Sequence, residues 1–338
     1  MDRPVCVLGA GSWGTVVAAL ASGPVRLWAR RDELAQEINA TRRNARYTAE
    51  LHLSERLWAT SSLREACQGA AAVLVAVPSA GFRAVATELV GLVAADAPVL
   101  SLTKGIERGT HETMTGILRS CLPSSSVGVL TGPNLAKELA LGMPAACVVA
   151  LGDEEGLRLV QERLHGPSFR VYTTTDVTGC EVAGATKNVL AIAAGVSDGL
   201  GFGDNTRATI ITRGLAEMGR LGVAMGGEAL TFGGLAGVGD LVATCTSDRS
   251  RNRRVGIGLG SGLDLDAAIA RVGEVAEGVT SAEPLVALAR DRGVELPICE
   301  QVAGMVAGDV TPAEALAALT ARPARGEWDV ELLRGPRR

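Results

Sequence analysis

The sequence predicts an α/β protein with two domains: a doubly wound, mostly parallel sheet in the N-terminal part and only helices in the C-terminal part. Short apolar runs of β type alternate with helical patterns up to about residue 150, the order expected of a parallel sheet with crossover helices. From residue 176 onward the patterns are helical and broken at glycines, and 338 residues exceed one typical compact core. We therefore expect domains at 1–175 and 176–321, followed by a flexible tail at 322–338 that is rich in Arg, Pro and Gly.

Composition and charge exclude several classes of protein. A net charge of −4 gives no electrostatic basis for binding nucleic acid. The chain enters a predicted strand almost at once, without a signal-peptide pattern, and its apolar runs are too short or too interrupted to span a bilayer. The seven cysteines are scattered and the three histidines lie far apart. We therefore expect a cytoplasmic protein with neither a disulfide framework nor a metal site.

The first predicted strand, Pro4–Leu8, leads directly into G-A-G-S-W-G-T at residues 9–15 and then into a helix. This is the G-x-G-x-x-G pattern in the context that a dinucleotide-binding turn requires, because backbone N–H groups at the start of the helix face a pyrophosphate. We expect Ser12 and Trp13 to present such groups, although the Trp13 ring equally suits ordinary packing. The glycines of the pattern are Gly9, Gly11 and Gly14.

The second predicted strand, Val25–Ala29, ends at Arg30 and Arg31. An NAD-specific fold usually carries an acidic residue here, which accepts a hydrogen bond from the ribose 2′-hydroxyl. Two guanidinium groups would instead pair with a 2′-phosphate. The sequence thus favours NADPH and NADP+ and leaves NADH and NAD+ open; a solvated surface pair is the alternative interpretation.

Two lysines are candidates for chemistry. Lys187 lies in an otherwise apolar helical stretch, where it either reaches water by snorkelling or is a desolvated amine that acts as a general acid or base. Lys104 follows a buried strand predicted within 98–107, at the edge of the sheet where ligands bind. It is either an anion contact or a merely exposed lysine. The loop T-G-P-N at 131–134 leads into another helix, and we expect Asn134 to lie near its cap.

A dense basic and polar cluster occupies residues 250–254, after a glycine-rich segment that contains Asp240. Arginine forks beside an asparagine suit a phosphate group. The alternative interpretation is a solvated run of charge.

Together these segments resemble the bacterial NAD(P)-dependent glycerol-3-phosphate dehydrogenase family. The resemblance implies a Rossmann-type N-terminal domain and an all-helical C-terminal domain like that of 6-phosphogluconate dehydrogenase. It also implies reduction of dihydroxyacetone phosphate to sn-glycerol 3-phosphate, the precursor of glycerophospholipids. The matching segments, in family order, are G-A-G-S-W-G-T at 9–15, V-P-S at 77–79, T-K-G-I-E at 103–107, T-G-P-N-L-A-K-E at 131–138, A-T-K-N-V at 185–189, G-L-G-F-G-D-N at 199–205, T-R-G-L-A-E-M at 212–218, G-D-L-V-A-T-C at 239–245, S-R-N-R-R-V-G at 250–256 and A-E-G-V at 276–279.

The resemblance implies a role for each matching site residue, with Lys187 as the catalytic acid and base and Thr244 close to the reacting centre. The family commonly has Ser or Thr where this chain has Asn134. The implied substrate contacts are Lys104, Gly132, Asn134, Lys187, Asp240, Ser250, Arg251 and Asn252, with Arg251 and Asn252 on the phosphate. The implied cofactor contacts are Gly9, Gly11, Ser12, Trp13, Gly14, Arg30, Arg31, Lys104, Ala136, Arg251, Val275 and Glu277.

Two other functions remain open at this point. One is a related dehydrogenase of the same fold that acts on another phosphorylated or a carboxylated substrate, against which the arginine cluster argues. The other is a non-catalytic NADPH sensor, against which the joint presence of Lys104, Lys187 and Asp240 argues. Dimers are common in the family, but the sequence leaves the oligomeric state open.

Overall fold

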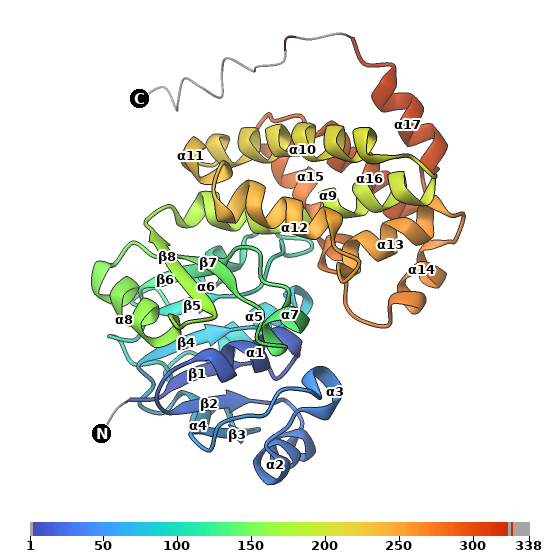
Figure 1. Cartoon of the computed structure of the whole chain (residues 1–338). Coiled ribbons are helices and arrows are strands. Elements are labelled where there is room, and N and C mark those ends of the chain that lie inside the picture. The colour runs from blue at the N-terminus through green and yellow to red at the C-terminus, as the bar shows by residue number, and fades with distance from the viewer. Residues whose placement is uncertain (1–2, 324–325, 327–338) are drawn as a thin grey trace. The chain divides into compact units, whose positions relative to one another are not determined.

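The computed structural model describes residues 3–323 and residue 326, which form two compact units (Figure 1). The first unit holds the described residues up to Thr103 together with Met114–Val177. The second holds the segment Lys104–Thr113 and the described residues from Thr178 onward. Of the expected flexible tail, residues 324–325 and 327–338 lie outside the described residues.

The first unit is built on an eight-stranded sheet with the strand order β3-β2-β1-β4-β5-β6-β7-β8. Neighbouring strands are parallel except β6 and β7, which are antiparallel. The mostly parallel sheet predicted from the sequence is therefore confirmed. The strands are β1 (Val5–Leu8), β2 (Val25–Trp28), β3 (Leu57–Thr60), β4 (Ala72–Val75), β5 (Val99–Ser101), β6 (Val127–Thr131), β7 (Ala145–Ala150) and β8 (Phe169–Thr174).

Eight helices connect these strands, and local sequence explains where several of them begin. Helix α8, for example, starts where the Asp153 carboxylate accepts hydrogen bonds from the backbone N–H groups of Glu155 and Gly156. Helix α2 ends at Arg42, which adopts a left-handed φ of 56°. The helices are α1 (Ser12–Leu20), α2 (Asp32–Thr41), α3 (Ala45–Thr48), α4 (Leu63–Cys67), α5 (Ser79–Glu88), α6 (Met114–Cys121), α7 (Ala136–Ala140) and α8 (Glu154–Leu164).

The second unit is helical, and the structure describes no strand between residue 175 and residue 323, as the sequence predicts. The glycines around residue 201 separate its two longest helices, in line with the glycine breaks expected after residue 176. Its helices are α9 (Val177–Gly199), α10 (Asp204–Ala224), α11 (Ala229–Phe232), α12 (Asp240–Thr246), α13 (Arg251–Gly260), α14 (Leu265–Val272), α15 (Glu277–Asp291), α16 (Pro297–Ala307) and α17 (Pro312–Thr320), with a π-helical turn at Leu235–Gly239.

Glycines bring α9 and α13 into direct backbone contact. A Cβ atom added to Gly195 of α9 would lie 2.0 Å from the carbonyl oxygen of Arg253, and one added to Gly256 of α13 would lie 2.1 Å from that of Ile192. Gly199 and Gly260 repeat this arrangement one helical turn further on, which gives each helix a G-x-x-x-G pair. Because the two backbones touch, α9 fixes the position of α13 and of the polar residues at its N-terminus.

One segment of the described residues, Ala229–Thr246, is long and apolar enough to be a candidate membrane span by length and composition. It is not a single continuous helix, because it contains α11, the π-helical turn and α12. It also carries the buried carboxylate of Asp240. Composition alone is weak evidence here, since core helices pass the same test.

Replacement of Gly256 by Ala should destabilise the protein by about 1–3 kcal/mol, because the new methyl group must displace the backbone of α9. The measurement is the thermal unfolding midpoint by scanning calorimetry. Gly81→Ala is the matched control: Gly81 lies in α5, and its Cβ position has no neighbour within 4 Å. That control should be neutral or slightly stabilising, and equal losses in both variants would mean that the α9–α13 contact is not tight.

Candidate active site

In the second unit, two lysines meet one buried carboxylate. Lys187 Nζ of α9 lies 2.8 Å from Asp240 Oδ1, and Lys104 Nζ lies 2.6 Å from Asp240 Oδ2. Lys187 is 7% exposed and Asp240 is 1% exposed. The structure thus brings together three residues that the sequence predicts as site residues, from segments far apart in the chain.

The start of α12 sets the position of Asp240. Helix α12 follows the π-helical turn, in which a Cβ atom on Gly237 would lie 2.1 Å from the Phe232 carbonyl oxygen. Thr244 lies one turn after Asp240 on the same face, and its Oγ1 accepts a hydrogen bond from Lys187 Nζ at 2.7 Å. The same hydroxyl donates to the Asp240 carbonyl oxygen. The Lys187 ammonium therefore has two oxygen partners on one helix.

Burial and charge shift the pKa values of this cluster. Burial lowers the pKa of Lys187 to about 8; the negative charge of Asp240 opposes this effect and the positive charge of Lys104 adds to it. Burial alone would raise the pKa of Asp240, but the charges of Lys104 and Lys187 outweigh it and hold that pKa below its usual value. Asp240 is thus a carboxylate at neutral pH, while Lys187 can gain and lose a proton close to neutrality.

The segment Lys104–Thr113 is anchored inside the second unit, although in sequence it follows β5 of the first. Ile106 belongs to the apolar core of the second unit, and its backbone N–H lies 3.4 Å from Ser281 Oγ. Asn188 Nδ2, adjacent to Lys187 in the chain, donates to the Lys104 carbonyl oxygen at 2.9 Å. The Lys104 side chain therefore reaches Asp240 from a fixed backbone.

The basic cluster of residues 250–254 divides into parts with different surroundings. Ser250 caps α13, with its Oγ accepting from the Arg253 backbone N–H. Arg251 is partly exposed, 3.6 Å from Glu274, whereas Asn252 Nδ2 donates to Asn188 Oδ1 and Asn252 Oδ1 accepts from the Gly278 N–H.

Arg253 forms two ion pairs that the sequence does not predict. Its guanidinium forms a buried ion pair with Asp198 at 2.7 Å and a second ion pair, at 2.6 Å, with the exposed carboxylate of Asp248. This residue stabilises the start of α13 and is not free to bind a ligand.

In the first unit, each glycine of the G-x-G-x-x-G pattern has its own physical reason. Gly9 has φ +114°, and a Cβ atom on Gly14 would lie 1.9 Å from the Gly9 carbonyl oxygen, so the turn and its packing require glycine at both positions. The Cβ position of Gly11 has nothing within 4 Å, which leaves room for a ligand to approach the backbone. No side chain caps the first turn of α1, so its N–H groups suit a pyrophosphate.

Arg30 and Arg31 follow β2 and are exposed, without an ion pair among the described residues. Trp13 packs edge to face against Phe169, with ring centroids 6.4 Å apart, which supports the packing interpretation of its ring. Val275 is exposed just before α15, of which Glu277 is the first residue.

The loop between β6 and α7 holds the remaining predicted contacts. Gly132 has φ +121° and lies against the backbone of Cys147. Leu135 is the cap residue of α7, so Asn134 lies next to the cap, as the sequence predicts. Both polar atoms of the Asn134 side chain are buried without a hydrogen-bond partner among the described residues, an arrangement that a bound ligand can satisfy. Ala136 is the first residue of α7.

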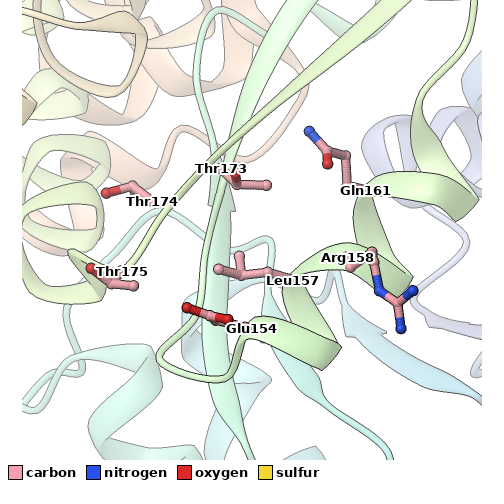
Figure 2. Close-up of a pocket in the computed structure, with 7 residues that line it drawn as sticks. All are labelled: Glu154, Leu157, Arg158, Gln161, Thr173, Thr174 and Thr175. Atoms are coloured by element: carbon pink, nitrogen blue, oxygen red, sulfur yellow. The ribbon is translucent and has the colours of Figure 1, made fainter.

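Figure 2 shows a separate pocket on the first unit, between α8 and the end of β8, the edge strand of the sheet. No residue predicted to bind substrate or cofactor lines it. The lining residues are Glu154, Leu157, Arg158, Gln161, Thr173, Thr174 and Thr175.

Comparison with known proteins covers nearly the whole chain. Residues 4–157 match the family described as NAD-dependent glycerol-3-phosphate dehydrogenase N-terminus, and residues 176–317 match its C-terminus. The glycerol-3-phosphate dehydrogenase of Sphingopyxis alaskensis is 49% identical over 313 residues, which cover 92% of this chain and 94% of that protein. The enzyme of Corynebacterium glutamicum strain R is 47% identical over 329 residues, or 96% of this chain and 99% of that protein.

A solved structure agrees with these matches. The crystal structure of glycerol-3-phosphate dehydrogenase from Coxiella burnetii superposes with a TM-score of 0.91 at 39% sequence identity, covering 95% of this chain and 99% of that one. Fold, motifs and relatives coincide, and the chain belongs to the NAD-dependent glycerol-3-phosphate dehydrogenase family.

Proposed function

We propose that this protein reduces dihydroxyacetone phosphate to sn-glycerol 3-phosphate, and catalyses the reverse oxidation, with a nicotinamide dinucleotide as cofactor. The observation that carries the proposal is the buried cluster of Lys104, Asp240 and Lys187. It places a proton donor with a pKa of about 8 beside a second positive charge, and the chain's relatives bear the name of this activity.

When bound, the nicotinamide cofactor would supply a hydride for the C2 carbonyl carbon of the ketone. Negative charge then develops on the carbonyl oxygen, and Lys187 in its ammonium form donates a proton to that oxygen. In the oxidation direction the neutral amine accepts the proton. Lys104 stabilises the developing charge, and Asp240 holds both amines in place through its two oxygens.

The start of α13 suits the phosphate of the substrate. Arg251 and Asn252 occupy the first turn of this ten-residue helix, where the positive end of the helix dipole favours an anion. Ser250 keeps that turn in shape. In the first unit, the unpartnered amide of Asn134 and the backbone at Gly132 provide further polar contacts for a small ligand.

The turn at residues 9–15 fits a dinucleotide, as the open space over Gly11 indicates. We propose NADPH and NADP+ as the preferred cofactor, because Arg30 and Arg31 are exposed where the ribose 2′ position is bound in this fold. NADH and NAD+ remain the alternative. Ser12, Trp13, Lys104, Ala136, Arg251, Val275 and Glu277 stay proposed contacts of the same cofactor.

We further propose a cytoplasmic location, which the free thiols of all seven cysteines support. The product would supply glycerophospholipid synthesis. We also propose that the protein is a homodimer, because dimers are common in the family. We expect no nucleic-acid partner.

The direct test is oxidation of NADPH by the purified protein, followed at 340 nm, with dihydroxyacetone phosphate beside unphosphorylated dihydroxyacetone. We expect turnover that depends on the phosphate. Equal turnover of both ketones would show that the start of α13 does not bind the substrate phosphate. Cofactor binding without turnover of either would favour a different substrate, or a sensor, on the same fold.

Lys187→Ala should leave the Kd for NADPH nearly unchanged and lower kcat about 10²- to 10⁴-fold, the usual contribution of a general acid. Lys187→Arg should be as inactive, because arginine keeps the charge but does not release its proton. In the wild-type enzyme, kcat/KM for reduction should fall as pH rises through about 8, since Lys187 then loses the proton it must donate. Normal activity in Lys187→Arg would show that charge alone suffices.

Arg30→Ala should weaken the binding of NADPH about 10- to 100-fold, because it removes a charged hydrogen-bonded pair. The binding of NADH should be nearly unaffected. The measurement is KM for both cofactors. Arg158→Ala, which removes an exposed arginine from α8, is the control. Equal losses for NADPH and NADH would mean that Arg30 does not recognise the 2′-phosphate.

A further inference from the structure

We propose that Asn44 is a positioning residue for the cofactor: its side-chain amide holds the glycine-rich turn at residues 9–15 in the shape that receives the pyrophosphate. The inference rests on the proposed role of that turn in binding the dinucleotide. Asn44 lies outside every segment that the sequence identifies with function.

One amide group joins both ends of the turn. Asn44 Nδ2 donates to the carbonyl oxygen of Ala10 at 3.0 Å and to Thr15 Oγ1 at 2.8 Å. Ala10 lies between the first two glycines, and Thr15 lies in the first turn of α1. Asn44 and Thr15 are both 0% exposed, so water does not compete for these bonds.

The polarity of the contact requires a donor at this position. The Ala10 carbonyl can only accept a hydrogen bond, so the NH₂ group of Asn44 must face it. A carboxylate there would direct a negative charge toward the carbonyl oxygen. Substitution by Asp therefore removes the bond to Ala10 with almost no change in side-chain size, whereas the Thr15 hydroxyl can donate to the new carboxylate.

The surrounding chain is folded so as to hold Asn44 in place. Helix α2 stops at Arg42 in a left-handed conformation, and Asn44 is the cap residue of the single-turn helix α3. The Asn44 carbonyl oxygen accepts from the backbone N–H groups of Tyr47 and Thr48 at 3.1 and 2.9 Å. Its backbone is thus fixed independently of the turn that its side chain supports.

The turn itself contains no side chain that could replace this support. Gly9 and Gly14 are held by close backbone packing, but Gly11 caps α1 without any side-chain bond and has open space on its outer side. With Asn44 removed, the peptide between Gly9 and Gly11 loses the bond that orients it. All dinucleotides share the pyrophosphate, so the loss should affect NADPH and NADH alike, unlike the loss of Arg30.

The experiment measures the Kd of the full-length protein for ADP-ribose, NADH and NADPH by calorimetry. Asn44→Asp should raise the Kd for all three ligands about tenfold. Thr15→Val removes only one hydrogen-bond acceptor and should raise each Kd about threefold. At saturating cofactor, kcat should stay within about twofold of the wild-type value and its pH dependence should be unchanged. A general destabilisation of the protein would lower kcat as well. Asn39→Ala is the matched control, because Asn39 also binds backbone, at Ala59 of β3, but does not touch the turn.

Unchanged Kd values in a folded Asn44→Asp protein would overturn the inference, and so would a loss confined to NADPH or an equal loss in Asn39→Ala. If Asn44→Asp does not fold, Thr15→Val decides: a Kd equal to that of wild type overturns the proposal. Wild-type protein that fails to bind ADP-ribose would instead overturn the proposed function on which the inference rests.

Discussion

The Asp240 carboxylate, buried between the Lys104 and Lys187 ammonium groups, is the interaction on which the site depends. Without it, two positive charges would lie close together, away from water and without a negative partner. A buried ion cluster of this kind adds little to stability compared with apolar side chains of equal volume. Its value is chemical, because it keeps one amine titrating close to neutrality and a second charge beside it.

The rest of the second unit holds this cluster in place. Close glycine contacts fix α13 against α9, which carries Lys187. The π-helical turn sets the start of α12 and hence Asp240, and Asn188 holds the backbone of Lys104. The residues that we propose as proton donor, charge partner and phosphate contact therefore share one packed scaffold, which is the preorganisation that hydride transfer to a carbonyl needs.

Local pattern was sufficient to predict the parallel sheet, the helical second unit and the glycine-rich turn, since each depends on periodicity or on neighbours in the sequence. For Lys187 the local pattern left snorkelling and acid–base chemistry both open, and the resemblance to the family favoured the second. The rest depends on partners distant in the chain. No sequence signal showed that Arg253 forms ion pairs with Asp198 and Asp248, whereas Arg251, two residues earlier, stays partly exposed. Nothing in the sequence indicated Asn44 either, because its role arises only when the segment between α2 and α3 packs against the turn after β1. The second Lys187 partner, Thr244, was indicated by the resemblance to the family, and its spacing of four residues from Asp240 on one helix agrees with that role.

The central claim is that Asp240 sustains the protonated state of Lys187, and the pH dependence of kcat/KM for ketone reduction by Asp240→Asn tests it most directly. Asn keeps the size of the side chain and removes its charge, and the charge of Asp240 raises the pKa of Lys187. The account predicts an alkaline limb at about pH 8 in the wild-type enzyme, set by the pKa of Lys187, and predicts that this limb moves to lower pH in the variant. An alkaline limb at the same pH in both proteins would contradict it.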